Sequence, residues 1–148
     1  MNMTIKQIRR WAAAVAAICL LTLFLPLYGM TAFAATARIA FSDPTASVGS
    51  EINVKMKITS SDNLSTADIM LAYDPGSLEF IEGTNAEGGN GAVRVHGDGG
   101  GANTTTLAYD LKFKASAAGT SKITVTSQEI YDASSQIVTV DKQGESQV

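Results

Sequence analysis

The chain has 148 residues, of which 45% are hydrophobic and 17% charged, with eleven basic and fourteen acidic side chains. All fourteen acidic residues but only eight basic ones follow position 34, so that part of the chain has a net charge of −6. This acidic balance, without an arginine-rich arm, excludes nucleic acid as a partner. The single cysteine, Cys19, precedes position 34, so a domain beyond it has no disulfide and depends on apolar packing.

The first 34 residues have the pattern of a secretory signal peptide. Three basic residues precede an apolar run from Trp11 to Tyr28, and Ala32-Phe33-Ala34 supplies the small residues that signal peptidase requires. We predict cleavage after Ala34, which leaves residues 35–148 as one secreted, extracellular domain. The apolar run is nearly long enough to span a membrane. A retained segment that anchors the protein at the cell surface is therefore the alternative.

Beyond residue 34, apolar and polar residues alternate, as in strands with one buried and one solvated side. The clearest run is 51–59, where Ile52, Val54, Met56 and Ile58 share one face. In chain order, the predicted strands are 36–41, 51–59, 66–73, 78–82, 92–96, 106–114, 122–127 and 136–140.

Turn signals separate these strands, and no window of eleven residues after position 34 has helical periodicity. Asp-Pro-Gly-Ser at 74–77 is the strongest turn, and two loops, 87–91 and 97–103, are rich in glycine. About eight short strands with turns at this spacing predict an all-β fold, an antiparallel β-sandwich. A closed barrel is the alternative.

Few residues are candidates for catalysis or metal binding. His96 is the only histidine and lies in a predicted strand, where it should face solvent, and no G-x-S-x-G motif accompanies it. Asp74 and Asp110 are candidates for a glycosidase-type carboxylate pair, but Asp74 opens a turn and Asp110 lies within a strand. Asp98 and nearby loop carbonyls could hold calcium only loosely, because no calcium-loop motif is present. We therefore expect a protein that is not an enzyme and has no cofactor or metal of its own.

Direct polysaccharide binding would need exposed aromatic rings to stack on sugar rings. Tyr73 and Tyr109 fall on the apolar sides of their strands and should be buried, and the only tryptophan, Trp11, is in the predicted signal peptide. Tyr131 is the one tyrosine expected to be exposed. A stacking surface for polysaccharide is therefore not expected.

Several segments together resemble the cohesin family. "SVGSEINVKMKI" is similar to its opening strand, and "LSTADIMLAYDPGSLEF" is similar to its strand that ends in Tyr-Asp-Pro and continues with Ser-x-Leu-Glu. "GAVRVHGDGGG" comes next, and "LAYDLKFKASAAGTSKITVTS" is similar to the segment before the family's final strands. The resemblance extends over about residues 37–140. It implies a jelly-roll β-sandwich of about nine strands, of the type grouped with carbohydrate-binding modules and with Ig-like sandwiches.

The resemblance also implies a function. Cohesins are non-catalytic modules that bind the dockerins of secreted glycoside hydrolases, and so assemble cellulosome-type complexes for polysaccharide catabolism. The calcium in such a complex belongs to the dockerin. Recognition uses one sheet face, with a polar pair two residues apart in the strand that ends in Tyr-Asp-Pro. Those positions hold Thr66 and Asp68 here; Asp68 matches the family's aspartate, whereas Thr66 replaces its common asparagine.

The alternation of residues supports the same face independently. Thr66, Asp68 and Met70 lie on the side of their strand opposite the apolar residues, and so do Arg94 and His96 on theirs. We hypothesise that these five residues share one surface and bind a dockerin-containing protein, with Met70 as an adaptable apolar contact. The alternative for these residues is that they are ordinary solvated strand residues. The alternative function is a carbohydrate-binding or adhesive cell-surface module on the same sandwich.

Overall fold

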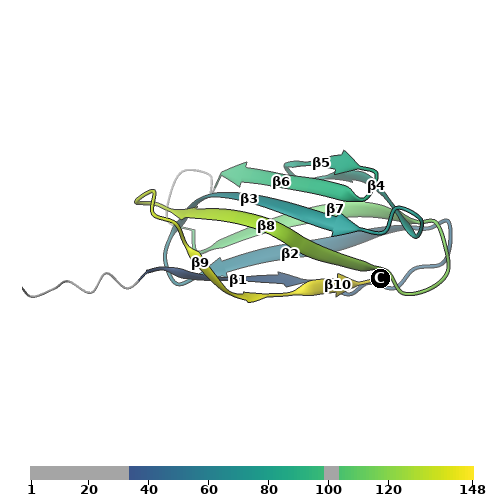
Figure 1. Ribbon diagram of the computed structural model, residues 1–148, viewed down its shortest axis with the longest axis horizontal. Coiled ribbons are helices and arrows are strands. Elements are labelled where there is room, and N and C mark those ends of the chain that lie inside the picture. Colours follow the sequence, from purple (N-terminus) through teal and green to yellow (C-terminus); the bar gives the residue numbers. More distant parts are fainter. Residues whose placement is uncertain (1–33, 99–103) are drawn as a thin grey trace, which may run out of the picture. The chain divides into compact units, whose positions relative to one another are not determined.

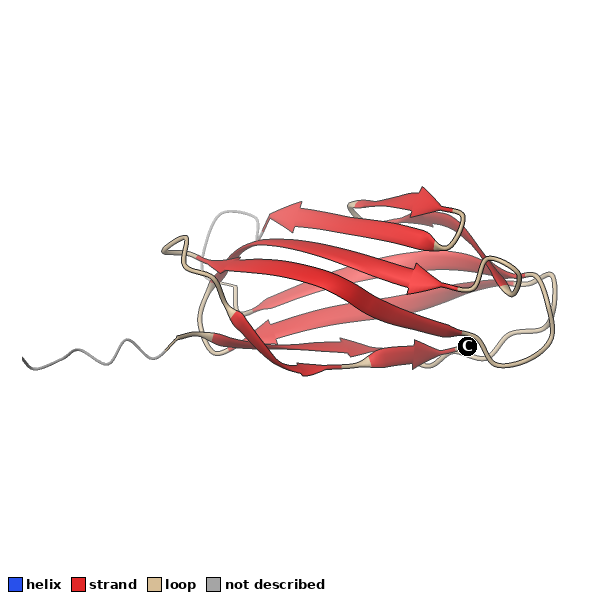
Figure 2. Ribbon diagram, viewed as in Figure 1, coloured by secondary structure: helices blue, strands red, loops and turns tan. Residues whose placement is uncertain are grey.

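The computed structural model describes residues 34–98 and 104–148, and all the regular elements in these ranges are strands (Figure 2). The predicted signal peptide lies outside them apart from its last residue, as does the glycine-rich segment 99–103. No helix in the described ranges is long and apolar enough to cross a membrane. The strands are β1 (Thr36–Phe41), β2 (Glu51–Ser60), β3 (Leu64–Tyr73), β4 (Leu78–Gly83), β5 (Ala86–Gly89), β6 (Ala92–Asp98), β7 (Thr106–Ala115), β8 (Lys122–Asp132), β9 (Thr139–Gln143) and β10 (Glu145–Gln147).

The strands form two layers that face each other (Figure 1). They are hydrogen-bonded in the order β10-β8-β3-β6-β5-β4-β7-β2-β1-β9, and the layers join at the β4–β5 hairpin, where Gly83 pairs with Ala86. The chain crosses between the layers again after β9, since β9 pairs with β1 whereas β10 pairs with β8. The predicted β-sandwich is confirmed, with one difference. β1 and β9 run parallel, and the other pairs are antiparallel.

Alternating side chains of both layers meet in one apolar core. The predicted buried faces of β2, β3 and β7 are all inside, including Tyr73 and Tyr109. Phe113 of β7 is fully buried, and its ring centroid lies 5.2 Å from that of Tyr73 and 5.4 Å from that of Phe80, edge to face in both cases. Because Tyr73 belongs to β3 and Phe80 to β4, Phe113 links the two layers.

The turn after β3 is stabilised by the side chain of Asp74. Its carboxylate accepts hydrogen bonds from the backbone N–H of Gly76 (2.9 Å) and the hydroxyl of Ser77 (2.7 Å). The Ser77 and Gly76 hydrogen bonds lower the pKa of Asp74. Asp110 lies far along β7 from this turn, because Leu78 pairs with Ala115 and Gly83 with Leu111. The two aspartates therefore do not form a carboxylate pair, and Asp74 has the turn role that its sequence context indicates.

Strand boundaries were less predictable than strand positions. β8 continues to Asp132, five residues past its predicted end, because a bulge at Thr126 interrupts the alternation. Met70 is opposite Ser127 and Leu71 is opposite Val125, which leaves Thr126 as the additional residue. β9 starts three residues later than predicted, and the short strands β5 and β10 were not predicted.

Candidate functional site

The five predicted partner-binding residues lie on the outer side of the layer β8-β3-β6-β5, here called the β3 face. Asp68 pairs with His96 and Met70 with Arg94 across β3 and β6, and Thr66 lies two residues before Asp68 on β3, on the same side of the strand. Residues opposite each other in a ladder point to the same side of the sheet. The β3 residues are half-buried, whereas Arg94 and His96 are exposed. The structure thus brings all five residues onto one surface.

Asp68 and Arg94 form a bidentate ion pair at the centre of the β3 face. The Nε–H of Arg94 donates to Oδ1 of Asp68 at 3.0 Å, and Nη2–H donates to Oδ2 at 2.5 Å. Such a pair fixes both the position and the orientation of the carboxylate. The Arg94 hydrogen bond is the main cause of a lowered pKa for Asp68, and it raises the pKa of Arg94. Asp68 is therefore charged and held in place on a solvent-facing surface.

His96 lies beside this pair. Its Nδ1 is 3.7 Å from Oδ2 of Asp68, beyond hydrogen-bond distance, and its side chain is 66% exposed. Its predicted orientation towards solvent is confirmed.

Four residues extend the β3 face beyond the set predicted from sequence. Glu129 and Tyr131 of β8 are opposite Asp68 and Thr66, and Glu87 of β5 is opposite Arg94. Ile137, which is 69% exposed, forms an isolated bridge with Tyr131. Tyr131 is half-buried rather than exposed as expected, since it lies between neighbours on both sides. If the alternation of β8 is continued with a shift of one residue after the bulge at Thr126, Glu129 and Tyr131 are assigned to this face.

The β3 face also contains a shallow depression of about 390 Å³. Met70 and Arg94 line it together with residues of the β5–β6 hairpin. Nearby, Glu129 has no ion pair within the described residues. The charge of Glu87 acts on Arg94 at longer range and contributes to its raised pKa. The face therefore combines an ordered ion pair, accessible apolar groups and a surplus of carboxylates.

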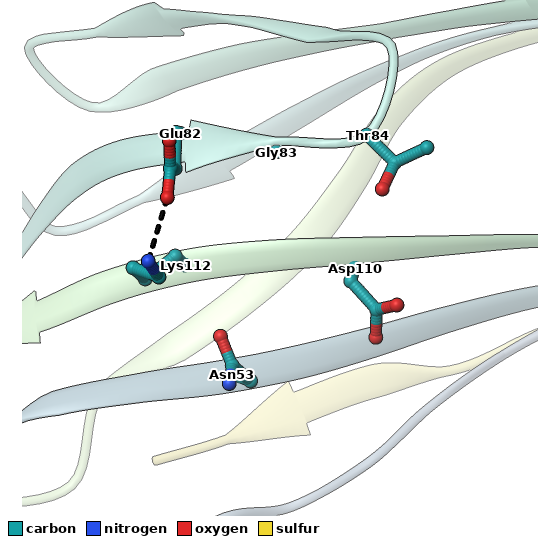
Figure 3. Close-up of a pocket in the computed structure, with 6 residues that line it drawn as sticks. All are labelled: Asn53, Glu82, Gly83, Thr84, Asp110 and Lys112. Atoms are coloured by element: carbon teal, nitrogen blue, oxygen red, sulfur yellow. Dashed lines mark hydrogen bonds and ion pairs between the residues drawn. The ribbon is translucent and has the colours of Figure 1, made fainter.

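The outer side of β4, β7 and β2, here called the β7 face, is organised differently. The Lys112 Nζ donates to Oε1 of Glu82 at 2.6 Å (Figure 3), which lowers the pKa of Glu82 and raises that of Lys112. Lys114 lies between Glu51 and Glu79 in the register, and Lys55 is opposite Asp110. Opposite charges thus face each other across the strands.

A depression of about 280 Å³ lies on the β7 face. Polar groups of Asn53, Thr84 and Asp110 surround it, beside the Glu82–Lys112 pair (Figure 3). No aromatic side chain is among its lining residues. The depression therefore offers no ring on which a sugar could stack.

No group of three or more histidine, cysteine or acidic side chains in residues 34–98 and 104–148 is placed to hold a metal ion. The loop that follows Asp98, where the sequence allowed a weak calcium site, lies outside the described residues, and so does the Asp98 side chain.

No family model matches the sequence, and no curated protein sequence matches it. Solved structures do match. A non-cellulosomal cohesin from the archaeon Archaeoglobus fulgidus is 21% identical, with 76% of this chain and 90% of that chain covered and a TM-score of 0.64. The chain has a cohesin-like fold.

Two further solved structures agree. The OlpA cohesin in a type I cohesin–dockerin complex from Clostridium thermocellum is 16% identical, with coverage of 75% of this chain and 97% of that chain and a TM-score of 0.63. A type II cohesin domain from the Acetivibrio cellulolyticus cellulosome is 17% identical, with coverage of 78% and 95% and a TM-score of 0.60. The cohesin-like jelly roll predicted from the sequence is thereby confirmed.

Proposed function

We propose that this protein is a secreted, non-catalytic module that binds a dockerin-containing protein through its β3 face. The observation that carries the proposal is the Asp68–Arg94 pair. The aspartate that matches the cohesin recognition motif lies at the centre of this face and is held there by two hydrogen bonds. A cohesin with the same fold forms a complex with a dockerin, which supports this assignment of the partner.

Preorganisation makes the β3 face suitable for docking. Asp68 is already ordered by Arg94, so its side chain loses little conformational entropy when a partner binds. Met70 and Tyr131 add apolar contact area beside the charged centre, as in the mixed surfaces of protein–protein interfaces. The carboxylates of Glu87 and Glu129 would complement basic side chains on the partner.

The partner that follows from this proposal is a dockerin on a secreted glycoside hydrolase, with calcium bound by the dockerin. The signal peptide predicted at residues 1–34 would bring this chain to the same extracellular compartment. Docking there would assemble polysaccharide-degrading enzymes on a common protein, as in a cellulosome. In this function the domain itself contributes binding and no chemistry.

A capture experiment tests the proposal. The immobilised protein is exposed to a secreted-protein mixture in calcium and then washed with chelator, and released proteins are identified by mass spectrometry. We expect dockerin-bearing glycoside hydrolases in the chelator wash, because the dockerin fold depends on its calcium. Retention of polysaccharide alone, or of proteins without dockerins, would instead favour a carbohydrate-binding or adhesive module.

A further inference from the structure

Met70 places a thioether at the centre of the β3 face. It is half-buried and lines the depression there together with Arg94, its pairing partner on β6. The other methionine in the described part of the chain, Met56, is fully buried in the core. Oxidation of methionine depends on access of the oxidant to sulfur. Met70 should therefore react much faster than Met56.

Oxidation would change the chemistry of this position. Hydrogen peroxide transfers one oxygen atom to the sulfur, which loses two electrons and becomes a sulfoxide, and the second peroxide oxygen leaves as water. An apolar, flexible side chain becomes a polar one with a strong hydrogen-bond acceptor.

Arg94 is positioned to bind that acceptor. Its guanidinium has five N–H groups, and Asp68 accepts from two of them. Side chains directly opposite each other in a ladder have their Cβ atoms about 5 Å apart. The remaining N–H groups of Arg94 are thus within reach of a sulfoxide oxygen on Met70. Such a bond would place a polar oxygen beside the Asp68–Arg94 pair and replace an apolar contact with a polar group.

We propose that Met70 is a modification site at which oxidation by hydrogen peroxide weakens docking on the β3 face. The effect on docking rests on the function proposed above, whereas selective oxidation at Met70 and the altered hydrogen bonding of Arg94 do not.

The first test needs no partner. The full chain is treated with hydrogen peroxide, quenched with catalase and examined by peptide mapping and by NMR of the arginine Nε–H groups. We expect Met70 to be oxidised at least about tenfold faster than Met56, together with a shift of the Arg94 Nε–H signal. The same treatment of Met70→Leu should leave that signal in place. Comparable rates at the two methionines, or an unchanged Arg94 signal in oxidised wild type, would overturn the proposal.

The second test measures docking. Calcium-loaded type I and type II dockerin modules are titrated against treated and untreated protein, and each variant is compared with its own untreated form. Wild type should bind at least about tenfold more weakly after oxidation, whereas Met70→Leu should be unaffected by the treatment. Equal losses in both proteins would assign the effect to another oxidised group and refute the role of Met70. If untreated wild type binds neither dockerin, the docking function fails, and with it the regulatory role, while the first test still decides the modification.

Discussion

The β3 face and the β7 face are built from the same alternating strands, and each has an ion pair with oxygen and nitrogen atoms in hydrogen-bond contact. On the β7 face, the charged residues around the Glu82–Lys112 pair also lie opposite residues of the other charge on the neighbouring strand. On the β3 face, Glu129 is left without an ion pair among the described residues, and Met70 and Tyr131 are accessible beside the Asp68–Arg94 pair. The two faces thus differ in the groups around their ion pairs. Charges on the β7 face are balanced by opposite charges across the strands, whereas groups on the β3 face remain available to a partner.

The largest expected effect comes from the core that both faces share. Phe113→Ala should lower the free energy of unfolding by about 3–5 kcal/mol, because a buried ring that packs on Tyr73 and Phe80 leaves a cavity. Denaturant unfolding measures this loss. Ile137→Ala, at a largely exposed position, is the control and should change the unfolding free energy by less than about 0.5 kcal/mol. A loss below about 1 kcal/mol for Phe113→Ala would contradict the packing described between the layers.

A second substitution should affect the β3 layer alone. A Cβ on Gly88 would lie 2.3 Å from the backbone oxygen of Ala92, so either β5 or β6 must move. Gly88→Ala should therefore lower the unfolding free energy by about 1–3 kcal/mol. Hydrogen exchange should become faster in β5 and β6 and stay unchanged in β2 and β7.

Gly89→Ala is the matched control for Gly88→Ala. The two glycines have similar φ angles, +152° and +157°, but a Cβ on Gly89 would meet nothing within 4 Å. If Gly88→Ala lowers the unfolding free energy more than Gly89→Ala does, the difference is therefore due to the clash with β6. Equal losses would show that backbone conformation, and not contact between the strands, is responsible.

The smallest effect is the pH dependence of the two ion pairs. The pKa of Asp68 and that of Glu82 are both lowered in the folded state. Their contributions to stability are therefore complete above the pKa of the unfolded chain, about 4, and are lost as the pH falls through the lower folded value. The Tm difference between wild type and Arg94→Ala should be constant above about pH 5 and should vanish at lower pH.

Lys112→Ala should show the same pH profile, because both are surface ion pairs in which the pKa of the carboxylate is lowered by its cationic partner. The two pairs should then contribute alike to stability, and under the proposed function only the Asp68–Arg94 pair should affect docking. A Tm difference for Arg94→Ala that grows as the pH falls would show that Asp68 is not stabilised in its charged form by Arg94.

The sequence predicted the strands whose alternation is unbroken, and it placed the five candidate residues on the correct sides of β3 and β6. It could not predict that Arg94 pairs with Asp68, because the register of strands 26 residues apart depends on the assembled sheet. β5 was missed because its sequence, Ala-Glu-Gly-Gly, has little strand propensity of its own. Glu129 and Tyr131 were missed for a different reason. The bulge at Thr126 shifts the alternation by one residue, and the predicted strand therefore ended before them.

We propose that the protein docks its partner through the β3 face, and calorimetric titration with a calcium-loaded dockerin measures this binding. Asp68→Ala and Glu82→Ala each remove the acid of one ion pair, on opposite sides of the same sandwich. We predict that Asp68→Ala weakens binding by well over tenfold with little change in Tm, because it removes an ordered group from the centre of the interface. Glu82→Ala should bind as wild type does. Unchanged binding by Asp68→Ala, or an equal loss in Glu82→Ala, would contradict the assignment of the β3 face.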